Sequence, residues 1–319
     1  MWFMHGCLSS VAGLGWRGSL LKSPSFSVLS RALWWLLLGI SQQSFAQDNA
    51  ILYRFKGDLG INEEHTRVLL ASILEATQSE YGPFNLKMNN TFMVRERLRL
   101  EMEHGDIVNV VAVSPSRGWD NCFRVGVPIR RGLGSYRMFV VRGEDESLFK
   151  SVNAVALVKQ YRTGAVKSWA TGGILEAHDF NVVYGPSVES LFSMLSMRRF
   201  DTLMRGLNEI YDELLVYQAL YPNLVVEKNA AIFTYFPNYF YVSPKRPRLA
   251  ERIAKGMQLV VANGEYFRLF EQYYGDDLRA ANLTAMKIFY VDNQTIPSSY
   301  YQADAPYLLD FKMVGVNLP

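Results

Sequence analysis

The chain has 319 residues, with 33 Lys and Arg, 30 Asp and Glu, and two cysteines. Three of the basic residues and none of the acidic ones lie within residues 1–46, so the remaining 273 residues carry 30 charges of each sign. A neutral balance without a run of five Lys or Arg argues against a nucleic-acid partner. A length of 273 residues indicates two lobes or one large α/β unit.

Residues 1–46 have the pattern of a secretory signal. Three basic residues precede the nine-residue apolar run "ALWWLLLGI" (32–40), and the small residues Ser44 and Ala46 follow it before Gln47. A membrane span needs roughly 20 apolar residues. The pattern therefore predicts a signal peptide that is cleaved before Gln47 and a periplasmic mature chain. An uncleaved anchor is the alternative.

The cysteines do not predict a disulfide. Cys7 lies in the predicted signal, which leaves Cys122 alone in the mature chain. We interpret Cys122 as a small buried residue, with a reactive thiol as the alternative.

Strand-like and helix-like runs alternate in the first part of the mature chain, as expected for an α/β sheet. The predicted strands span 51–55, 84–89 and 107–113. A helix is expected from about Asn62, because Glu63 and Glu64 in its first turn complement the helix dipole. A second helix is expected over 92–102.

The second part of the chain shows the same alternation after the extended, glycine-containing segment 127–141. Strands are predicted at 165–167, 180–185 and 200–204, and helices at 172–177, 188–197 and 208–219. The extended stretch 230–243 could return the chain to the first lobe. Residues 247–277 predict two helices, separated at Asn263-Gly264, with the second ending at Gly275.

Three segments resemble extracellular solute-binding proteins of family 3, the type II periplasmic binding proteins. "YFYVS" with "LAERIAKGMQLVVANGEYFRLFEQYYG" is similar to the carboxy-terminal signature of that family. "HGDIVNVVAVSPSRGW" (104–119) resembles its "G-x-x-D…T-P-x-R" segment, and "MRRFDTLMRG" (197–206) resembles its "G-x-x-D-A" strand. Each motif is weak alone, and the resemblance rests on their order across nearly the whole mature chain.

The resemblance implies an α/β fold with two lobes, a type II periplasmic-binding-protein-like architecture that closes on a solute by hinge motion. Residues 47–138 and 240–319 would form lobe 1, and residues 139–239 lobe 2. The two hinge strands would be 136–142 and 239–242. The segment after Gly275 is longer than is usual in the family, and we expect it to pack on lobe 1.

The resemblance also implies ligand-binding residues in lobe 1. Arg117 stands where the family has the arginine that holds a ligand carboxylate, and the planar guanidinium suits this role because its donors match two carboxylate oxygens. An ordinary surface arginine is the alternative. Trp119 could wall the cleft, and a place in the core is an equal alternative.

Trp169 and Thr171 are the candidates of lobe 2, because "KSWATGG" (167–173) matches the family's loop at a helix start. The amino terminus of a helix favours an anionic group. A plain helix cap at Thr171 is the alternative.

Arg205 and Glu209 complete the predicted site. In amino-acid-binding members an aspartate that captures the α-amino group follows the strand equivalent to 200–204, and that position here is Gly206. This departure argues against an amino-acid ligand. Asp201 matches a structural aspartate of the strand. Arg205 with Arg117 would suit an acidic solute, unless Glu209 pairs with Arg205 and cancels its charge.

No catalytic constellation stands out in the sequence. The histidines of the mature chain, His65, His104 and His178, show no metal-ligand spacing, and we expect them at the surface. There is no nucleophile elbow and no phosphate-binding glycine loop. The sequence thus predicts no enzyme, no cofactor and no metal. It predicts a monomer that binds a small-molecule solute and delivers it to a membrane transporter, with a sensor or interaction module on the same fold as the alternative.

Overall fold

The computed structural model describes residues 47–55 and 60–314. The predicted signal peptide, residues 1–46, lies outside the described residues. Among the helices of the described ranges, none is both long enough and apolar enough to cross a membrane.

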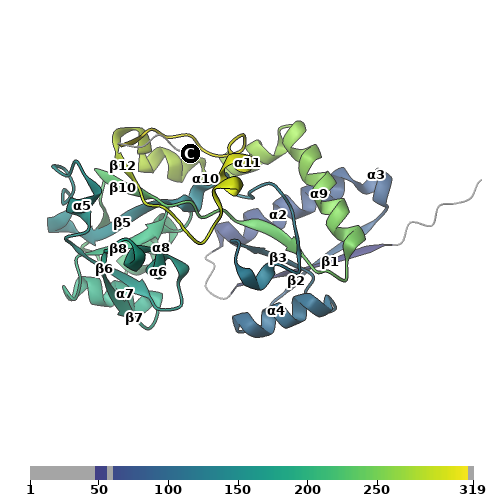
Figure 1. The fold of residues 1–319 in the computed structure, drawn as a ribbon, viewed down its shortest axis with the longest axis horizontal. Helices are drawn as coiled ribbons and strands as arrows, with labels where there is room; N and C mark the ends of the chain where they lie inside the picture. Colours follow the sequence, from purple (N-terminus) through teal and green to yellow (C-terminus); the bar gives the residue numbers. More distant parts are fainter. Residues whose placement is uncertain (1–46, 56–59, 315–319) are drawn as a thin grey trace, which may run out of the picture. The chain divides into compact units, whose positions relative to one another are not determined.

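The first sheet is the centre of lobe 1 (Figure 1). Its strands are β1 (Asp48–Tyr53), β2 (Phe84–Asn89), β3 (Val110–Val113), β4 (Phe123–Arg124) and β11 (Tyr239–Val242). The spatial order is β2-β1-β3-β11-β4. β1 runs parallel to β2 and β3, whereas β11 runs antiparallel to β3 and β4. Strand β11, which comes more than 100 residues after β4 in the sequence, therefore lies inside the sheet, between β3 and β4.

The second sheet repeats this order in lobe 2. Its strands are β5 (Tyr136–Arg142), β6 (Arg162–Val166), β7 (Asn181–Gly185), β8 (Thr202–Gly206), β9 (Leu224–Val226), β10 (Ala230–Phe233), β12 (Lys287–Tyr290) and β13 (Met313–Val314). In the run β7-β6-β8-β5-β10, β5 is antiparallel to its neighbours and arrives from lobe 1. Both lobes thus share one topology, and the chain has the two-lobed α/β architecture that the family resemblance predicts.

Helices cover both faces of the first sheet. They are α2 (Ile61–Ala76), α3 (Gln78–Tyr81), α4 (Arg95–His104), the 3-10 turn η1 (Arg117–Trp119), α9 (Pro247–Ala262) and α10 (Glu265–Ala281). In β11, Phe240 faces the core formed with α2 and α9, and Tyr241 faces the core formed with α4 and η1. Burial on both faces explains the continuous apolar run of β3.

Helices α2 and α9 lie so close that only glycine fits at their contact. A Cβ atom on Gly256 of α9 would lie 2.3 Å from the carbonyl oxygen of Ile73 in α2.

We expect Gly256→Ala to lower the free energy of unfolding by about 1–3 kcal/mol, because the helices must move apart. Gly173→Ala in α6 (Ala170–Ala177) is the matched control, since a Cβ there meets nothing within 4 Å. It should raise stability by about 0.5–1 kcal/mol. Urea denaturation of both variants checks this, and equal effects would contradict the close approach.

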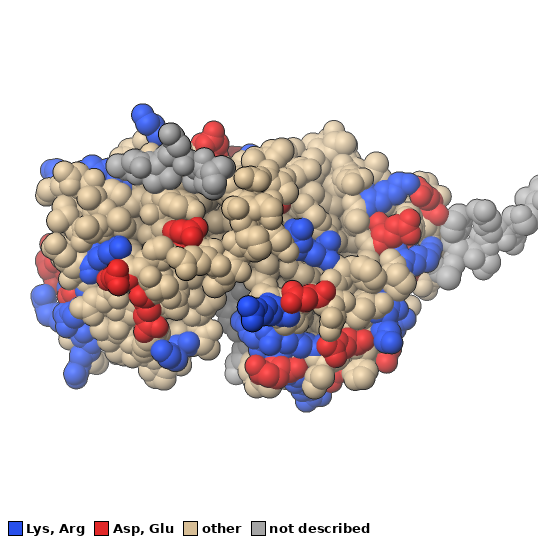
Figure 2. All heavy atoms as spheres, viewed as in Figure 1, with Lys and Arg blue, Asp and Glu red and all other residues tan. Residues whose placement is uncertain are grey.

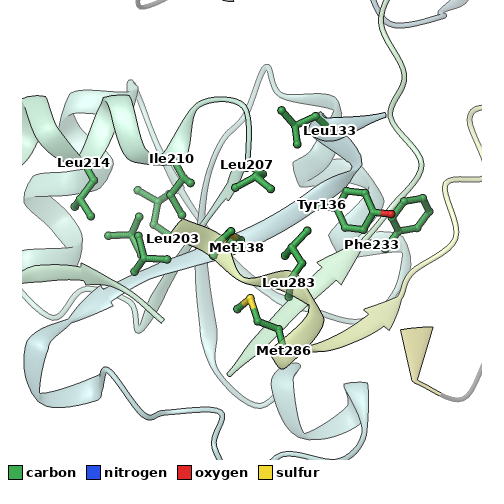
Figure 3. Close-up of a cluster of buried hydrophobic side chains, with 14 of the residues drawn as sticks. Leu133, Tyr136, Met138, Leu203, Leu207, Ile210, Leu214, Phe233, Leu283 and Met286 are labelled. Atoms are coloured by element: carbon green, nitrogen blue, oxygen red, sulfur yellow. The ribbon is translucent and has the colours of Figure 1, made fainter. Parts of the chain in front are cut away.

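Lobe 2 has two cores, one on each face of its sheet. The helical elements are η2 (Leu133–Ser135), η3 (Gly143–Asp145), α5 (Val155–Val158), α6 (Ala170–Ala177), α7 (Val188–Ser196), α8 (Ile210–Gln218), η4 (Leu283–Ala285) and α11 (Ser298–Asp304). Met138 of β5 packs with Leu203 and Ile210 in the core shown in Figure 3. Its neighbour Phe139 points into the opposite core with α6.

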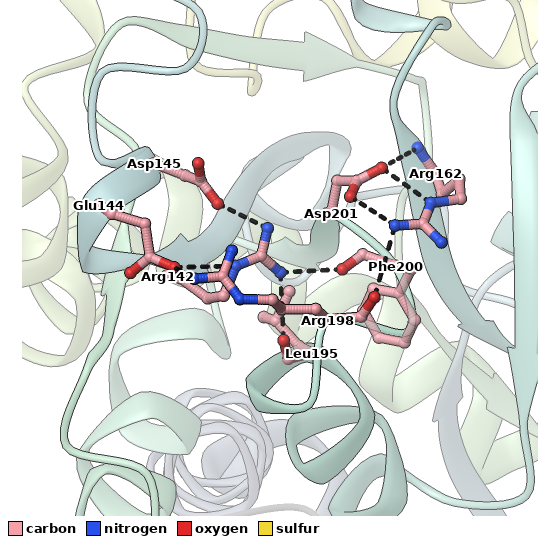
Figure 4. A network of polar contacts seen from close by, with 8 residues as sticks. All are labelled: Arg142, Glu144, Asp145, Arg162, Leu195, Arg198, Phe200 and Asp201. Carbon is pink, nitrogen blue, oxygen red and sulfur yellow. Dashed lines mark hydrogen bonds and ion pairs between the residues drawn. The ribbon is translucent and has the colours of Figure 1, made fainter.

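A charged network marks the edge of the second sheet at the amino ends of β6 and β8 (Figure 4). Asp201 accepts hydrogen bonds from the backbone N–H of Arg162 at 2.9 Å and from its guanidinium at 2.8 and 3.1 Å. Buried Arg142 donates to the carbonyl oxygen of Phe200 at 3.0 Å and to Asp145 at 2.6 Å. Asp201 is therefore structural, and this edge is opposite the carboxyl ends of the parallel strands.

Two segments connect the lobes, residues 125–135 and residues 234–238, here named the first and second connecting segments. They are bonded to one another: the N–H of Ile129 donates to the carbonyl oxygen of Asn238 at 2.8 Å, and that of Thr234 to Ser135 at 3.0 Å. The predicted hinge strands 136–142 and 239–242 need correction, because each lies within one sheet and the crossing precedes it. The predicted lobe boundary at 138/139 falls inside β5.

The expectation that the segment after Gly275 packs on lobe 1 is wrong in its main part. β12 pairs with β10 in the second sheet, and Leu283, Met286 and Ile288 belong to the core of lobe 2. Helix α10 also continues through Gly275 to Ala281, and it ends at Asn282 in the left-handed conformation, with φ 48°. Tyr274 and Ala281 are buried in the lobe 2 core, and their burial offsets the cost of a glycine inside the helix.

Candidate functional site

In open α/β sheets, ligands bind at the carboxyl ends of the parallel strands. A cavity of about 20 Å³ lies at this edge in lobe 1, and its lining includes Tyr53 at the end of β1, Glu63 and Thr66 of α2, and Arg130 of the first connecting segment. This volume is room for roughly one water molecule. A larger solute therefore requires the lining side chains to move apart.

Arg130 is the central cation of this edge. It is buried, and its Nε donates to the hydroxyl of Tyr274 at 3.1 Å, while Nη2 donates to the carbonyl oxygen of Asn62 at 3.1 Å and to Thr66 Oγ1 at 2.8 Å. Within the described ranges, no carboxylate forms an ion pair with Arg130 and no acceptor bonds its Nη1. The cavity also borders Arg54 and Glu63, which pair at 2.7 Å. Among the described residues, the lining thus contains one arginine, Arg130, that forms no ion pair with a carboxylate.

Asn62 links the two lobes beside Arg130. Its side-chain nitrogen donates to the carbonyl oxygen of Asn208, in the loop between β8 and α8, at 2.8 Å. Its Oδ1 accepts from the hydroxyl of Tyr274 at 2.9 Å. The first turn of α2 is thereby fixed to lobe 2 next to the cavity.

His65, which also belongs to α2, is a buried neutral base. Its side chain is fully buried, and neither ring nitrogen has a hydrogen-bond partner in the part of the chain that the structure describes. Its ring packs against those of Tyr273 and Tyr274, with centroids 5.5 and 5.0 Å away. Burial, aided by the charge of Arg130, lowers the pKa of His65 to about 3. The expectation of a surface histidine was wrong for His65, whereas His104 is exposed.

In lobe 2, the carboxyl end of β8 carries a compensated charge cluster made of Arg137, Arg205, Glu209 and Glu213, here named the Arg–Glu cluster. Arg205 makes a two-pronged bond to Glu213, with Nε donating to Oε2 at 2.5 Å. It also lies 3.1 Å from Glu209, and Arg137 lies 3.2 Å from the same carboxylate. The cluster contains two guanidinium groups and two carboxylates, so their formal charges cancel.

Electrostatics keep Glu209 ionised in this cluster. Burial acts to raise the pKa of its carboxyl, but the guanidinium groups of Arg205 and Arg137 outweigh that effect and hold the pKa below its usual range. Burial dominates at Glu213 and raises its pKa. Arg205 is therefore already satisfied by two carboxylates, which corrects its prediction as a cation that holds an acidic solute. The alternative, pairing with Glu209, is confirmed.

The surroundings of Gly206 leave little room for a side chain at this position. A Cβ atom at Gly206 would lie 2.6 Å from Asn208 Oδ1 and 3.2 Å from Glu209 Oε1. The backbone N–H of Gly206 donates to the same Glu209 oxygen at 2.9 Å. The carboxylate of Glu209 thus folds back against the end of β8.

Arg117 and Trp119 differ in their surroundings. Arg117 is exposed, and its side chain has no hydrogen bond or ion pair with any described residue. Trp119 is only 1% exposed and packs in the lobe 1 core, 6.1 Å from the ring of Tyr241. Trp119 therefore does not wall a cleft, and the core alternative is confirmed. A ligand role for Arg117 stays a prediction.

Trp169 belongs to the surroundings of the Arg–Glu cluster. It is the N-cap residue of α6, and its ring lies 4.3 Å from the guanidinium carbon of Arg205. Thr171 is the second residue inside the helix, so it is not the cap. The structure thus brings together Trp169, Arg205 and Glu209. No hydrogen bond, ion pair or ring contact between described residues joins Arg117 or Thr171 to them.

Sequence reasoning missed Arg130, Asn62, Arg137 and Glu213. The signal for Arg130 was its place in the extended segment 127–141 between the two predicted lobes. Cys122 is half-buried, and burial raises the pKa of its thiol to about 11, so the thiol stays protonated. Within residues 47–55 and 60–314, no group of three or more His, Cys, Asp or Glu could hold a metal ion.

Larger cavities lie elsewhere. One of about 470 Å³ lies at the amino ends of β1 and β2, and one of about 250 Å³ lies beside Tyr290 and Asn293. Neither lies at the carboxyl ends of the parallel strands of lobe 1. On the face shown in Figure 2, Lys and Arg are intermixed with Asp and Glu.

No family model matches this sequence, and no curated protein sequence matches it either. Solved structures with a similar fold exist. An amino acid ABC transporter substrate-binding protein from Streptococcus pneumoniae bound to L-arginine is 12% identical, with a TM-score of 0.48 over 71% of this chain and 94% of that one. Substrate-binding domain 2 of Lactococcus lactis GlnP is 18% identical, with a TM-score of 0.47 over 72% and 95% of the two chains. A histidine kinase sensor domain is 12% identical, with a TM-score of 0.47 over 71% and 96%.

Proposed function

We propose that this chain is a solute-binding protein of the two-lobed periplasmic type, and that it binds a small anionic solute between its lobes. The observation that carries the proposal is Arg130: a buried guanidinium without a carboxylate partner in the described ranges lines a cavity at the carboxyl ends of β1 and β3. Exposed Arg117, at the end of the loop after β3, would supply a second positive charge. Guanidinium groups suit carboxylate and phosphate ligands.

The remaining parts of the proposal follow the sequence. The predicted signal peptide supports a periplasmic location, and delivery to an ABC-type membrane transporter is the corresponding proposal for the partner. An amino-acid ligand is disfavoured, because Gly206 offers no carboxylate to an α-amino group and Glu209 already balances two arginines. We propose that the chain binds and releases this solute unchanged.

Thermal denaturation with a ligand panel tests this function. The panel contains monocarboxylates, dicarboxylates, phosphate, amino acids, sugars and polyamines. An anion present at 100 times its dissociation constant should stabilise the protein by about 2.7 kcal/mol. Arg117→Ala should reduce this shift, whereas Arg199→Ala, which removes an exposed arginine before β8, should not. A panel in which only polyamines or sugars shift the midpoint would contradict an anionic solute.

A further inference from the structure

The segment after β12 crosses both connections between the lobes. Residues 291–311, here named the C-terminal clasp, lie between β12 and β13 of the second sheet and contain α11. The clasp contacts the second connecting segment through Asn293, whose side chain donates to the carbonyl oxygen of Tyr235 at 2.8 Å. It contacts the first through Leu309, whose N–H donates to the carbonyl oxygen of Arg131 at 3.0 Å. One piece of chain therefore holds both connections.

Asp304 is the centre of the clasp. Its side chain is fully buried, and its Oδ2 accepts hydrogen bonds from the hydroxyls of Tyr235 and Tyr239. Tyr235 lies in the second connecting segment, and Tyr239 is the first residue of β11 in lobe 1. Oδ1 of Asp304 is also buried and has no partner among the described residues. Among the described residues, only these two phenols donate hydrogen bonds to this carboxylate, so a movement that separates them from Asp304 leaves it without a hydrogen bond in the interior.

Further contacts fix the clasp on either side of Asp304. The guanidinium of Arg131 donates to the carbonyl oxygen of Tyr307 at 3.1 Å, and Tyr136 at the start of β5 donates its hydroxyl to Leu309 at 2.8 Å. A Cβ atom on Gly132 would lie 2.9 Å from the side chain of Leu308. The ring of Tyr300 lies 4.1 Å from the guanidinium carbon of Arg124 in β4. The clasp thus packs against residues of both sheets.

Helix α10 adds a second connection that does not pass through the connecting segments. Tyr266 and Leu269 in its first half belong to the core of lobe 1, and Phe270 and Tyr274 belong to the core of lobe 2. A hinge motion requires a few residues to change φ and ψ while the lobes stay rigid. Here the clasp contacts both connecting segments, where a hinge would lie, and α10 belongs to the cores of both lobes.

We propose that the C-terminal clasp fixes the angle between the lobes by holding both connecting segments through Asp304. The lobes then do not rotate about these segments as independent bodies. This inference concerns the protein without ligand, so it stands or falls separately from the proposed function.

Distance measurement between the lobes tests the clasp. Spin labels are placed at exposed Ser79 in lobe 1 and exposed Glu189 in lobe 2, each replaced by cysteine, with Cys7→Ser and Cys122→Ser as background. Pulsed electron paramagnetic resonance on the full chain should give one narrow distance distribution. Tyr235→Phe and Tyr239→Phe each remove one bond to Asp304 and leave the other, and each should broaden the distribution or add a second distance.

Tyr184→Phe is the matched control. It also removes a phenol bond to a carboxylate, that of Glu176, but within lobe 2 and outside both the clasp and the connecting segments. It should leave the distribution unchanged. A broad or two-peaked distribution in the labelled parent would overturn the proposal, as would distributions for both Tyr235→Phe and Tyr239→Phe that match the control. The distance distribution of the parent can overturn the proposal even where a variant folds poorly.

Discussion

Replacing Glu213 by alanine is expected to lower the free energy of unfolding by about 3–5 kcal/mol, toward the lower end because Glu209 remains beside Arg205 at 3.1 Å. The cause is the guanidinium of Arg205, which is 8% exposed and loses the carboxylate that binds two of its nitrogens. A buried charge without its partner is costly because it keeps its desolvation penalty and loses the compensating attraction. Urea denaturation at pH 7 measures the change.

Two further variants separate the ion pair from the loss of side-chain volume. Glu271→Ala removes a carboxylate that pairs with Arg279 and is 61% exposed, and it should change stability by no more than about 0.5 kcal/mol. The double variant Arg205→Met, Glu213→Leu fills the same space without charge and should recover most of the loss. A double variant as unstable as Glu213→Ala would contradict this explanation and indicate that volume, not charge, matters here.

His65 is expected to make the protein lose stability in mild acid. Its pKa is about 3 in the folded chain, against 6.5 for the ordinary side chain. Between these values the unfolded chain binds a proton that the folded chain does not, so the free energy of unfolding falls as pH falls through this window. The slope approaches about 1.4 kcal/mol per pH unit, which amounts to roughly 2 kcal/mol between pH 7 and pH 5.

The comparison of His65→Leu with the parent isolates this contribution, because the other titrating groups are common to both. Denaturation from pH 7 to pH 4 should show a smaller pH dependence for His65→Leu. His104→Gln, at an exposed position, should keep the slope of the parent. If His65→Leu and the parent have the same slope, the buried neutral histidine is ruled out.

Local patterns predicted much of the secondary structure. The alternating stretch 84–89 is β2 over the same residues, and the charged first turn of Glu63 and Glu64 opens α2. The similarity of the two lobes followed only from the family resemblance. The place of β12 was missed because its pairing with β10 is a long-range contact, which no local pattern encodes.

The site was predicted less well than the fold, for a physical reason. Arg205 looked like a charge at the end of a buried strand, but its partner Glu213 lies in the first turn of the next helix, and only the packing of α8 brings the two together. Trp119 lies two residues after exposed Arg117, yet the 3-10 turn directs the tryptophan side chain into the core. Arg130 became visible only when the connecting segments placed it at the carboxyl ends of the strands of lobe 1.

The central claim is that a small anion binds at Arg130, and calorimetric titration tests it most directly. Succinate and phosphate are titrated into the parent, into Arg130→Gln and into Arg199→Ala. The account predicts that at least one anion binds the parent and Arg199→Ala alike, and that Arg130→Gln weakens this binding at least tenfold, a change of about 1.4 kcal/mol. If no anion binds the parent, or if Arg130→Gln binds as tightly as the parent, the proposed site is contradicted.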